Sequence, residues 1–323
     1  MFVEFKLGKD IILTCSNKGK KMKRIVVTGA TGFLGKKIAQ ELIARGDEVT
    51  IFTRSIKNAR RIIPNSYDYV EWKPELKNWY QRLEGKDAVI NLAGENVMAK
   101  RWDAEHKKNI LSSRIDSTRS LVNAIKELNK KPKTFVCASA VGYYGNSENP
   151  VTENSESGKD FLADVVSKWE SEASKVESYG VRRVSIRTGI VLDKQEGALV
   201  PMINQFKYFV GGSIGNGRQW FPWIHIDDIV GIFLFALDNR NVNGVLNASS
   251  PNPLRMNDFC KNLGFVMHRP SLFKVPSLII KILFGEAAEV LLNGAHVFPE
   301  RTIQAGYKFK FETAEEALKN LLQ

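Results

Sequence analysis

The chain has 323 residues, of which 43% are hydrophobic and 25% charged, the composition of a globular protein with a substantial core. Its formal net charge is +12, but outside Lys130, Lys131 and Lys133 the cations are scattered. Because no helix-turn-helix, zinc-finger or RNA-binding signature accompanies them, we expect no specific nucleic-acid partner. No apolar run is long enough to cross a bilayer, so we also expect no membrane span.

The first 21 residues form a basic leader that lacks the apolar core of a secretory signal. Met22 opens the first predicted strand and is therefore an alternative start. The three cysteines, Cys15, Cys137 and Cys260, are far apart and odd in number. This favours a reducing compartment without a disulfide framework or a metal site, and we expect a cytoplasmic location.

From residue 24 onward, short β-branched runs alternate with amphipathic stretches, which predicts right-handed crossovers and a parallel sheet with helices on both faces. The predicted strands are 24–30, 48–54, 67–72, 87–94, 133–140 and 182–192, and the predicted helices are 33–46, 104–128 and 161–179. We therefore expect an α/β fold with a Rossmann-type, doubly wound parallel sheet.

After about residue 195 the alternation loosens. Residues 225–237 read as a strand leading into a helix, 244–249 as a strand, and "YKFKF" (307–311) as a strand in a region otherwise made of helices. We interpret 22–247 as a nucleotide-binding domain, with 195–224 contributing to its cleft, and 251–323 as a smaller, discontinuous C-terminal lobe on the substrate side. Such a lobe closes over the carboxyl ends of the strands, where ligands of these folds bind.

The stretch "VTGATGFLG" follows the first strand and opens the first helix. Gly29 permits a tight turn, Gly32 lets backbone amides approach a pyrophosphate, and Gly35 lets the helix pack closely on the sheet. The N-terminus of the helix supplies oriented N–H groups for the anion. With Thr31, Phe33 and Leu34 between the glycines, this loop predicts a dinucleotide site.

The end of the second strand indicates which dinucleotide binds. NAD-binding units place Asp or Glu there for the ribose 2′-hydroxyl, whereas this chain has Thr53 and Arg54. A guanidinium fork suits a 2′-phosphate, although a solvated surface arginine is the alternative reading. We expect NADP(H) as the cofactor.

With "TGATGFLG", "DAVINLAGENV", "SAVGYYG" and "FPWIHIDD" in order, the chain resembles the NAD-dependent epimerase/dehydratase family of the extended short-chain dehydrogenase/reductase group. Within that group it looks like the branch of epimerase family proteins that end in a domain of unknown function. The resemblance implies further cofactor contacts from Leu92, Ala93 and Gly94, from Arg114, and from Leu192. For Arg114 a surface charge, and for Leu192 a core position, are equally open readings.

The chain departs from the pattern of the wider group, in which a serine and a helical Tyr-x-x-x-Lys perform the chemistry. Lys168 stands on the expected helix and would orient the nicotinamide ribose, but Asp164 replaces the tyrosine. A carboxylate beside a lysine is a poor acid at pH 7. Ser139, Tyr143 and Tyr144 are therefore the candidate catalytic residues beside Lys168. His225 is interpreted as structural, with Asp227 or Asp228 capping the next helix.

Two functions remain open from the sequence. One is an NADP(H)-dependent oxidoreductase or epimerase-like enzyme that acts on a carbonyl or hydroxyl group of an unknown small molecule. The other is an NADP-binding regulatory or redox-sensing protein that kept the cofactor site and lost turnover. Neither the substrate nor the oligomeric state follows from the sequence.

Overall fold

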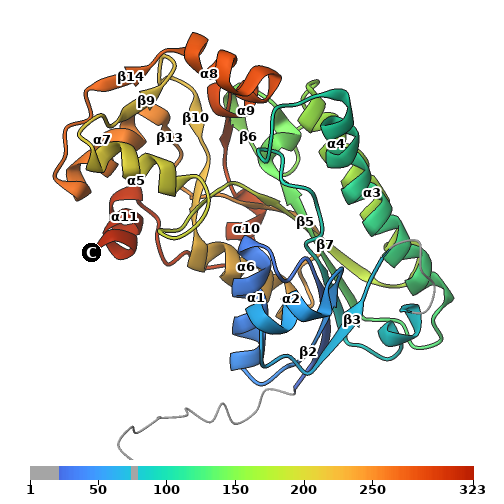
Figure 1. The fold of residues 1–323 in the computed structure, drawn as a ribbon. Helices are drawn as coiled ribbons and strands as arrows, with labels where there is room; N and C mark the ends of the chain where they lie inside the picture. The colour runs from blue at the N-terminus through green and yellow to red at the C-terminus, as the bar shows by residue number, and fades with distance from the viewer. Residues whose placement is uncertain (1–21, 74–78) are drawn as a thin grey trace, which may run out of the picture.

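The structure is a computed structural model that describes residues 22–73 and 79–323. The leader, with Cys15, lies outside the described residues. A seven-stranded parallel sheet in the order β12-β7-β5-β4-β1-β2-β3 forms the centre of the molecule (Figure 1). The strands are β1 (Arg24–Thr28), β2 (Glu48–Thr53), β3 (Asp68–Glu71), β4 (Ala88–Asn91), β5 (Thr134–Ala140), β7 (Arg182–Thr188) and β12 (Gly244–Ala248).

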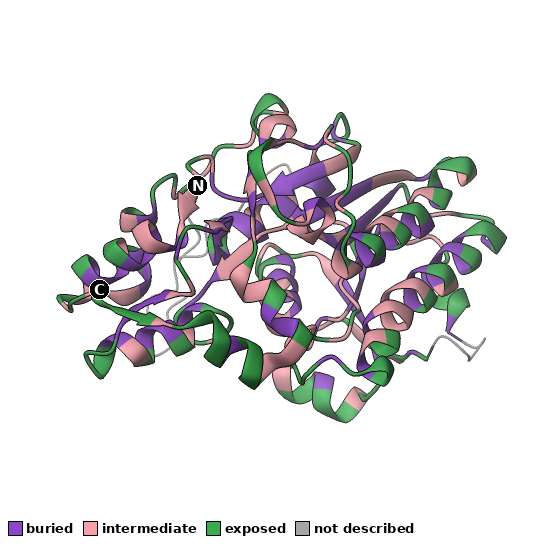
Figure 2. Cartoon of the chain, turned by 90° about the horizontal axis from the view of Figure 1, so that it is seen from above, coloured by how far each residue is buried: buried purple, intermediate pink, exposed green. Residues whose placement is uncertain are grey.

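Helices cover both faces of this sheet, because each helix buries one apolar stripe against it. One hydrophobic cluster joins α1, α2 and α6 to the sheet, and a second joins α3 and α4 to its opposite face. Figure 2 shows the result, with buried strands in the middle and exposed outer helix faces. The helices are α1 (Phe33–Ala44), α2 (Ile56–Ile62), α3 (Ala104–Glu127), α4 (Phe161–Ser174) and α6 (Ile226–Asp238).

The remaining elements form a smaller lobe over the carboxyl ends of the strands (Figure 1). Small strand pairs tie it together across the sequence: β6 with β15, β9 with β14, β10 with β13, and β8 with β11. The small strands are β6 (Ser147–Val151), β8 (Ile190–Leu192), β9 (Gly212–Ile214), β10 (Trp220–Phe221), β11 (Trp223–His225), β13 (Leu254–Arg255), β14 (Phe273–Val275) and β15 (Ala295–Val297). The helices are α5 (Leu199–Lys207), α7 (Met256–Met267), α8 (Ser277–Phe284), α9 (Glu289–Leu292), α10 (Glu300–Gln304) and α11 (Ala314–Leu322). The 3₁₀ turns of the chain are η1 (Tyr80–Leu83), η2 (Val141–Tyr144), η3 (Lys175–Tyr179) and η4 (Gly285–Ala288).

The predicted fold class, a Rossmann-type parallel sheet with a smaller discontinuous lobe, is confirmed. The single strand expected over 182–192 is wrong, because Gly189 divides it into β7 and β8. A Cβ on Gly189 would lie 2.2 Å from the carbonyl oxygen of Pro222. Ile190 donates its N–H to that oxygen (2.7 Å), and the chain leaves the large sheet to pair with β11. Helix α2 and strand β6 are additions to the predicted elements.

The strand expected at "YKFKF" is also wrong. The backbone N–H groups of Lys310 and Phe311 donate to the buried Asp228 carboxylate at 2.7 and 3.1 Å, in place of a neighbouring strand. The Tyr307 hydroxyl donates to the same carboxylate at 3.2 Å. Asp228 therefore fastens the C-terminal segment to α6, and it does not cap that helix. The cap is His225, whose Nδ1 accepts from the N–H of Asp227 (3.0 Å).

Replacing Asp228 with alanine should lower the free energy of unfolding by about 2 kcal/mol, because the partly buried N–H groups of Lys310 and Phe311 lose a charged acceptor, while the Tyr307 hydroxyl keeps the backbone carbonyl of residue 228 (3.0 Å). Urea unfolding measures this loss. Asp227→Ala is the matched control: Asp227 is exposed on the same helix, and its loss should cost less than about 1 kcal/mol. Equal losses in the two variants would contradict the role of Asp228 in fastening the C-terminal segment to α6.

Candidate functional site

The candidate site begins where β1 and β4 end side by side in the sheet. Ligands of open α/β sheets bind at such a switch point, because the crossovers on either side of it diverge and leave a crevice. Here β2 follows on one side of β1 and β4 lies on the other. The Thr28 hydroxyl donates to Asn91 Oδ1 (2.7 Å) and accepts from the N–H of Leu92 (3.2 Å). These bonds hold the loops after β1 and β4 against each other.

The glycine loop between β1 and α1 has the geometry that close backbone approach requires. Gly29 has a φ of 66°, and a Cβ there would lie 2.5 Å from the carbonyl oxygen of Leu92. A Cβ on Gly35 would lie 2.2 Å from the oxygen of Gly29. Side chains at these two positions would therefore force the loops or the helix apart.

Gly32 begins α1 in extended conformation, with no side-chain cap and no acidic residue in the first turn. The N–H groups of that turn, beside Thr31, Phe33 and Leu34, are consequently left without a capping acceptor. A helix N-terminus of this kind favours an anion through its oriented N–H groups and its dipole.

The end of β2 presents a cationic group to solvent. Thr53 exchanges hydrogen bonds with Ser55 at the start of α2, and Arg54 is exposed. No carboxylate among residues 22–73 and 79–323 forms an ion pair with Arg54. Its neighbours on α2 add Lys57, Arg60 and Arg61 without an acid, so this corner of the molecule is strongly positive.

Arg114 lines the floor of the site from α3. Its guanidinium lies against Gly94, stacks 5.3 Å from the Trp169 ring, and donates to the carbonyl of Ile110 (2.9 Å). Burial lowers the pKa of Arg114 to about 10, so the group stays charged at neutral pH. Leu92, Ala93 and Gly94 reach the same region from the end of β4.

A cleft of about 310 Å³ opens beyond these groups, at the carboxyl ends of β5 and β7. Ala140, Thr188 and Gly189 form its floor, and α4 and the C-terminal lobe form its walls. Arg114 is shared between this inner cleft and the loop after β4. Through Arg114 the inner cleft adjoins the loop after β4, which in turn packs against the glycine loop.

The catalytic candidates Ser139, Tyr143 and Tyr144 gather around Arg187 below this cleft. Arg187 is 3% exposed and forms a double ion pair with Glu170 (2.7 and 2.8 Å), while the Ser139 hydroxyl donates to the same carboxylate (2.5 Å). Tyr143 stacks on the guanidinium, 3.4 Å from its ring centre. None of the three candidates lines the inner cleft.

Tyr144 is the most constrained of these candidates. Its hydroxyl accepts from Arg187 (2.9 Å) and donates to Asn247 Oδ1 (2.7 Å). Burial raises the pKa of Tyr144 to about 12, so it is a protonated phenol at neutral pH with its donor already engaged. This arrangement suits a structural network better than a proton shuttle.

Lys168 lies elsewhere. It is exposed on α4, pairs with Asp164 at 2.7 Å one helical turn earlier, and is absent from the lining of the cleft. The face of α4 that does line the cleft carries Leu162, Val165 and Val166, which have no acid or base. Leu192 is fully buried in the core, paired with His225 between β8 and β11, which agrees with the core reading of that residue.

Sequence reasoning missed Glu170, which holds Arg187 and Ser139 together. A signal was present: Glu170 follows Val166 by one helical turn, so it falls on the buried face of α4. A carboxylate on an apolar face is rarely buried unless it is paired. What the sequence does not reveal is the partner, because Arg187 lies on a strand 17 residues away.

Cys137 and Cys260 offer no nucleophile, since both are buried and burial raises each thiol pKa to about 12. Within 22–73 and 79–323 no cluster of three or more His, Cys, Asp or Glu side chains is arranged to hold a metal ion. In the same residues no helix is both long and apolar enough to span a membrane.

Comparison with known proteins gives consistent similarities. Residues 25–249 match the NAD dependent epimerase/dehydratase family, and residues 275–321 match a domain of unknown function, DUF1731. The chain is 41% identical over 318 residues to the chloroplastic epimerase family protein SDR39U1 homolog of Arabidopsis thaliana, covering 98% of this chain and 91% of that one. It is 38% identical over 300 residues to the epimerase family protein YfhF of Bacillus subtilis, covering 92% and 97%.

Among solved structures, the human epimerase family protein SDR39U1, crystallised with NADPH, superposes with a TM-score of 0.81. The two chains are 34% identical, and the match covers 92% of this chain and 98% of the human one.

Glu170→Gln should lower the free energy of unfolding by about 3 kcal/mol, because Arg187 is then left as a buried, uncompensated charge. Glu177→Gln is the matched control, since Glu177 pairs with Arg183 (2.9 Å) while itself 47% exposed. That surface pair should cost at most about 1 kcal/mol. Chemical denaturation of both variants measures the difference, and a Glu170→Gln loss no larger than the control would contradict the account of the network.

Proposed function

The chain belongs to the NAD-dependent epimerase/dehydratase family, and from that premise we propose that it binds NADP(H) and works as an oxidoreductase or epimerase-like enzyme on a carbonyl or hydroxyl group. The observation that carries the proposal is the pairing of the glycine loop with an open, ligand-sized cleft beside it. A fold that only stored a nucleotide would not need that second space.

The residues at the switch point fit the cofactor. The uncapped N-terminus of α1 and the close-packed Gly29 and Gly35 suit a pyrophosphate. Thr53 and Arg54 would hold the 2′-phosphate of the adenosine ribose, because a guanidinium binds phosphate oxygens with two parallel hydrogen bonds. Leu92, Ala93 and Gly94 would lie along the adenosine ribose. The NADPH of the human relative supports the same choice.

Arg114 would neutralise negative charge between the glycine loop and the inner cleft, since its guanidinium forms no ion pair among the described residues and only Glu95 is a nearby carboxylate. NADPH, when bound, supplies a hydride. The chain's own part is to hold the acceptor in the cleft and to keep it away from bulk water. Lys168 and Leu192 take no part in this proposal, because one is solvent-exposed on α4 and the other is buried core.

Proton transfer differs in this proposal from the Tyr–Lys relay of the wider group. The hydroxyls of Ser139 and Tyr144 already donate to Glu170 and Asn247, and neither lines the cleft. We propose that Ser139 and Tyr144, with Tyr143, position the floor of the cleft through Arg187. The proton for the substrate oxygen would then come from solvent at the mouth of the cleft.

A second candidate function is regulatory, and a specific observation favours it. Large apolar side chains are exposed on α8, at the start of β14 and in the turn before β9, which pairs with β14: Tyr208, Phe209, Val210, Leu272, Phe273, Leu278, Ile279, Ile282 and Leu283. Exposed apolar patches of this kind mark interaction sites. A protein that reports the state of its nucleotide to a partner would combine such a surface with a cleft that lacks a proton relay. The cytoplasmic location stays a prediction under both functions.

Arg54→Ala tests the cofactor proposal. NADPH should bind the wild-type protein more tightly than NADH, and the variant should lose about 10- to 100-fold in NADPH affinity with NADH unchanged, because charge-assisted bonds to the 2′-phosphate are lost. Calorimetric titration measures each affinity. Arg240→Ala is the control: it removes the same charge from the turn before β12, at the opposite edge of the sheet.

Equal affinity for the two nucleotides, unchanged by Arg54→Ala, would remove the proposed 2′-phosphate contact. Failure of both nucleotides to bind would remove the cofactor itself, and the enzymatic and regulatory functions would fall together.

A further inference from the structure

The inner cleft has an apolar wall. Most of its lining side chains carry no polar atom, and they come from the loop after β4, from α4, from β8 and from the C-terminal lobe: Val97, Phe161, Leu162, Val166, Ile190 and Val290. Trp102 and Phe161 meet edge to face, with ring centres 5.2 Å apart. Several of these residues share one hydrophobic cluster with α9 and η4, so the wall is continuous across the two lobes.

The inner cleft has few polar side chains. Three of them already have partners within the protein, whereas Glu289 and Asn293 stand where the cleft meets a second cavity. Asp160 accepts from the N–H of Ala163 (2.9 Å) as the cap of α4, and the Thr188 hydroxyl donates to the carbonyl of Ile186 (3.3 Å). Arg114 is bonded to Ile110 and stacked on Trp169. A sugar has several hydroxyls to satisfy. Each hydroxyl buried here without a partner would cost about 1–3 kcal/mol of binding free energy, which corresponds to a 5- to 150-fold loss of affinity.

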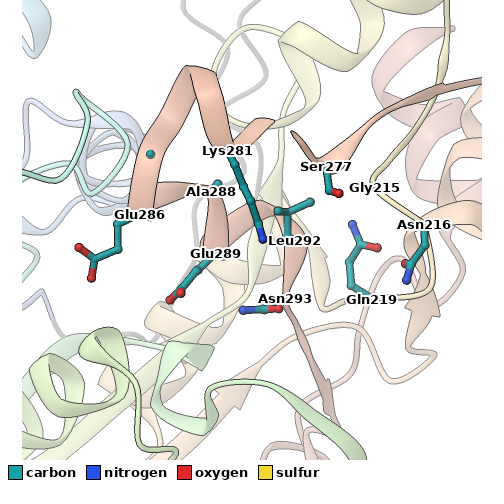
Figure 3. A pocket seen from close by; sticks show the side chains of 11 residues that line it. Gly215, Asn216, Gln219, Ser277, Lys281, Glu286, Ala288, Glu289, Leu292 and Asn293 are labelled. Carbon is teal, nitrogen blue, oxygen red and sulfur yellow. The ribbon is translucent and has the colours of Figure 1, made fainter. Parts of the chain in front are cut away.

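A second cavity, of about 590 Å³, adjoins the cleft at Glu289 and Asn293, which line both. Its lining is largely polar, and Figure 3 shows Lys281, Glu289 and Gln219 turned toward its interior. Gln219 is fixed by bonds to the carbonyls of Ile214 and Leu291 (3.0 and 3.1 Å). Polar parts of a ligand therefore find partners at Glu289 and Asn293 and in the second cavity beyond them.

We infer that the ligand taken up beside the cofactor presents an apolar aliphatic or aromatic body to the inner cleft, and that a nucleotide sugar does not fit there. The inference rests on the proposed function for its location and names the class of substrate. It follows from matching the buried surface: Leu162, Val166 and Val290 gain by desolvating an apolar group, and a polyhydroxylated ring would leave its donors unpaired. Any polar substituent of the ligand extends toward Lys281 and Gln219.

Calorimetric titration of the full chain tests this inference with defined probes. Nonanamide carries a carbonyl on an apolar body and is not reducible under these conditions, and UDP-glucose is the polar comparator; each is titrated with and without NADPH. Nonanamide should bind and UDP-glucose should not. Leu162→Asn should weaken nonanamide about tenfold or more, because an amide then lines the cleft.

Val290→Thr is the second variant, since it keeps the shape of the side chain and replaces one methyl group by a hydroxyl; it should weaken nonanamide by about threefold or more. Phe265→Asn, an apolar-to-polar change on the exposed face of α7, should leave the affinity unchanged. Three results would each overturn the inference: no binding of nonanamide, nonanamide binding that neither cleft variant weakens, or tighter binding of UDP-glucose than of nonanamide. Loss of NADPH binding with nonanamide binding intact would count against the proposed function alone.

Discussion

The site depends on one buried cation. Arg187 enters the interior on β7, and a charge in that environment is tolerated only when every side of it is paired. Glu170 from α4, Tyr144 from η2 and, through Tyr144, Asn247 from β12 supply that pairing, with Tyr143 stacked on the open face. Because each partner comes from a different element, satisfying one guanidinium fixes the relative positions of a helix, a turn and two strands. This network therefore fixes the ends of β5 and β7, which form the floor of the inner cleft.

Local sequence was enough where the cause is local. Gly29 and Gly35 indicate a close backbone approach, because a side chain at either position would collide with a neighbouring carbonyl group. The absence of an acid after β2 makes Arg54 the candidate contact to a 2′-phosphate. Long-range pairing was beyond the sequence. "YKFKF" has the alternation of a strand, yet two of its N–H groups donate to the carboxylate of Asp228, about 80 residues away in the chain. The same holds for Ser139. A serine at that position is expected to contact the substrate, but its hydroxyl donates to Glu170, 31 residues away in the chain.

Position 168 illustrates a related limit of motif transfer. A lysine four residues after an acid on the expected helix matches the spacing of a catalytic pair, but spacing fixes only which residues share a helix face, and the rotation of the helix decides where that face points. Here Leu162 and Val166 turn toward the cleft, and Lys168 turns to water with Asp164. The half of the fold that carries the proposed cofactor site thus has the glycine loop and helix N-terminus expected of it, while the inner cleft is lined mostly by apolar side chains.

The hydrogen bonds from Lys310 and Phe311 to Asp228 can form only late in the synthesis of the chain. A ribosome releases this chain from its N-terminus at about 5–20 residues per second, so α6 emerges well before Lys310 and Phe311. Until those N–H groups emerge, the Asp228 carboxylate lacks two of the donors that it has in the folded protein. The strands of the parallel sheet therefore all emerge before the segment that fastens to α6, and α11 emerges after that segment.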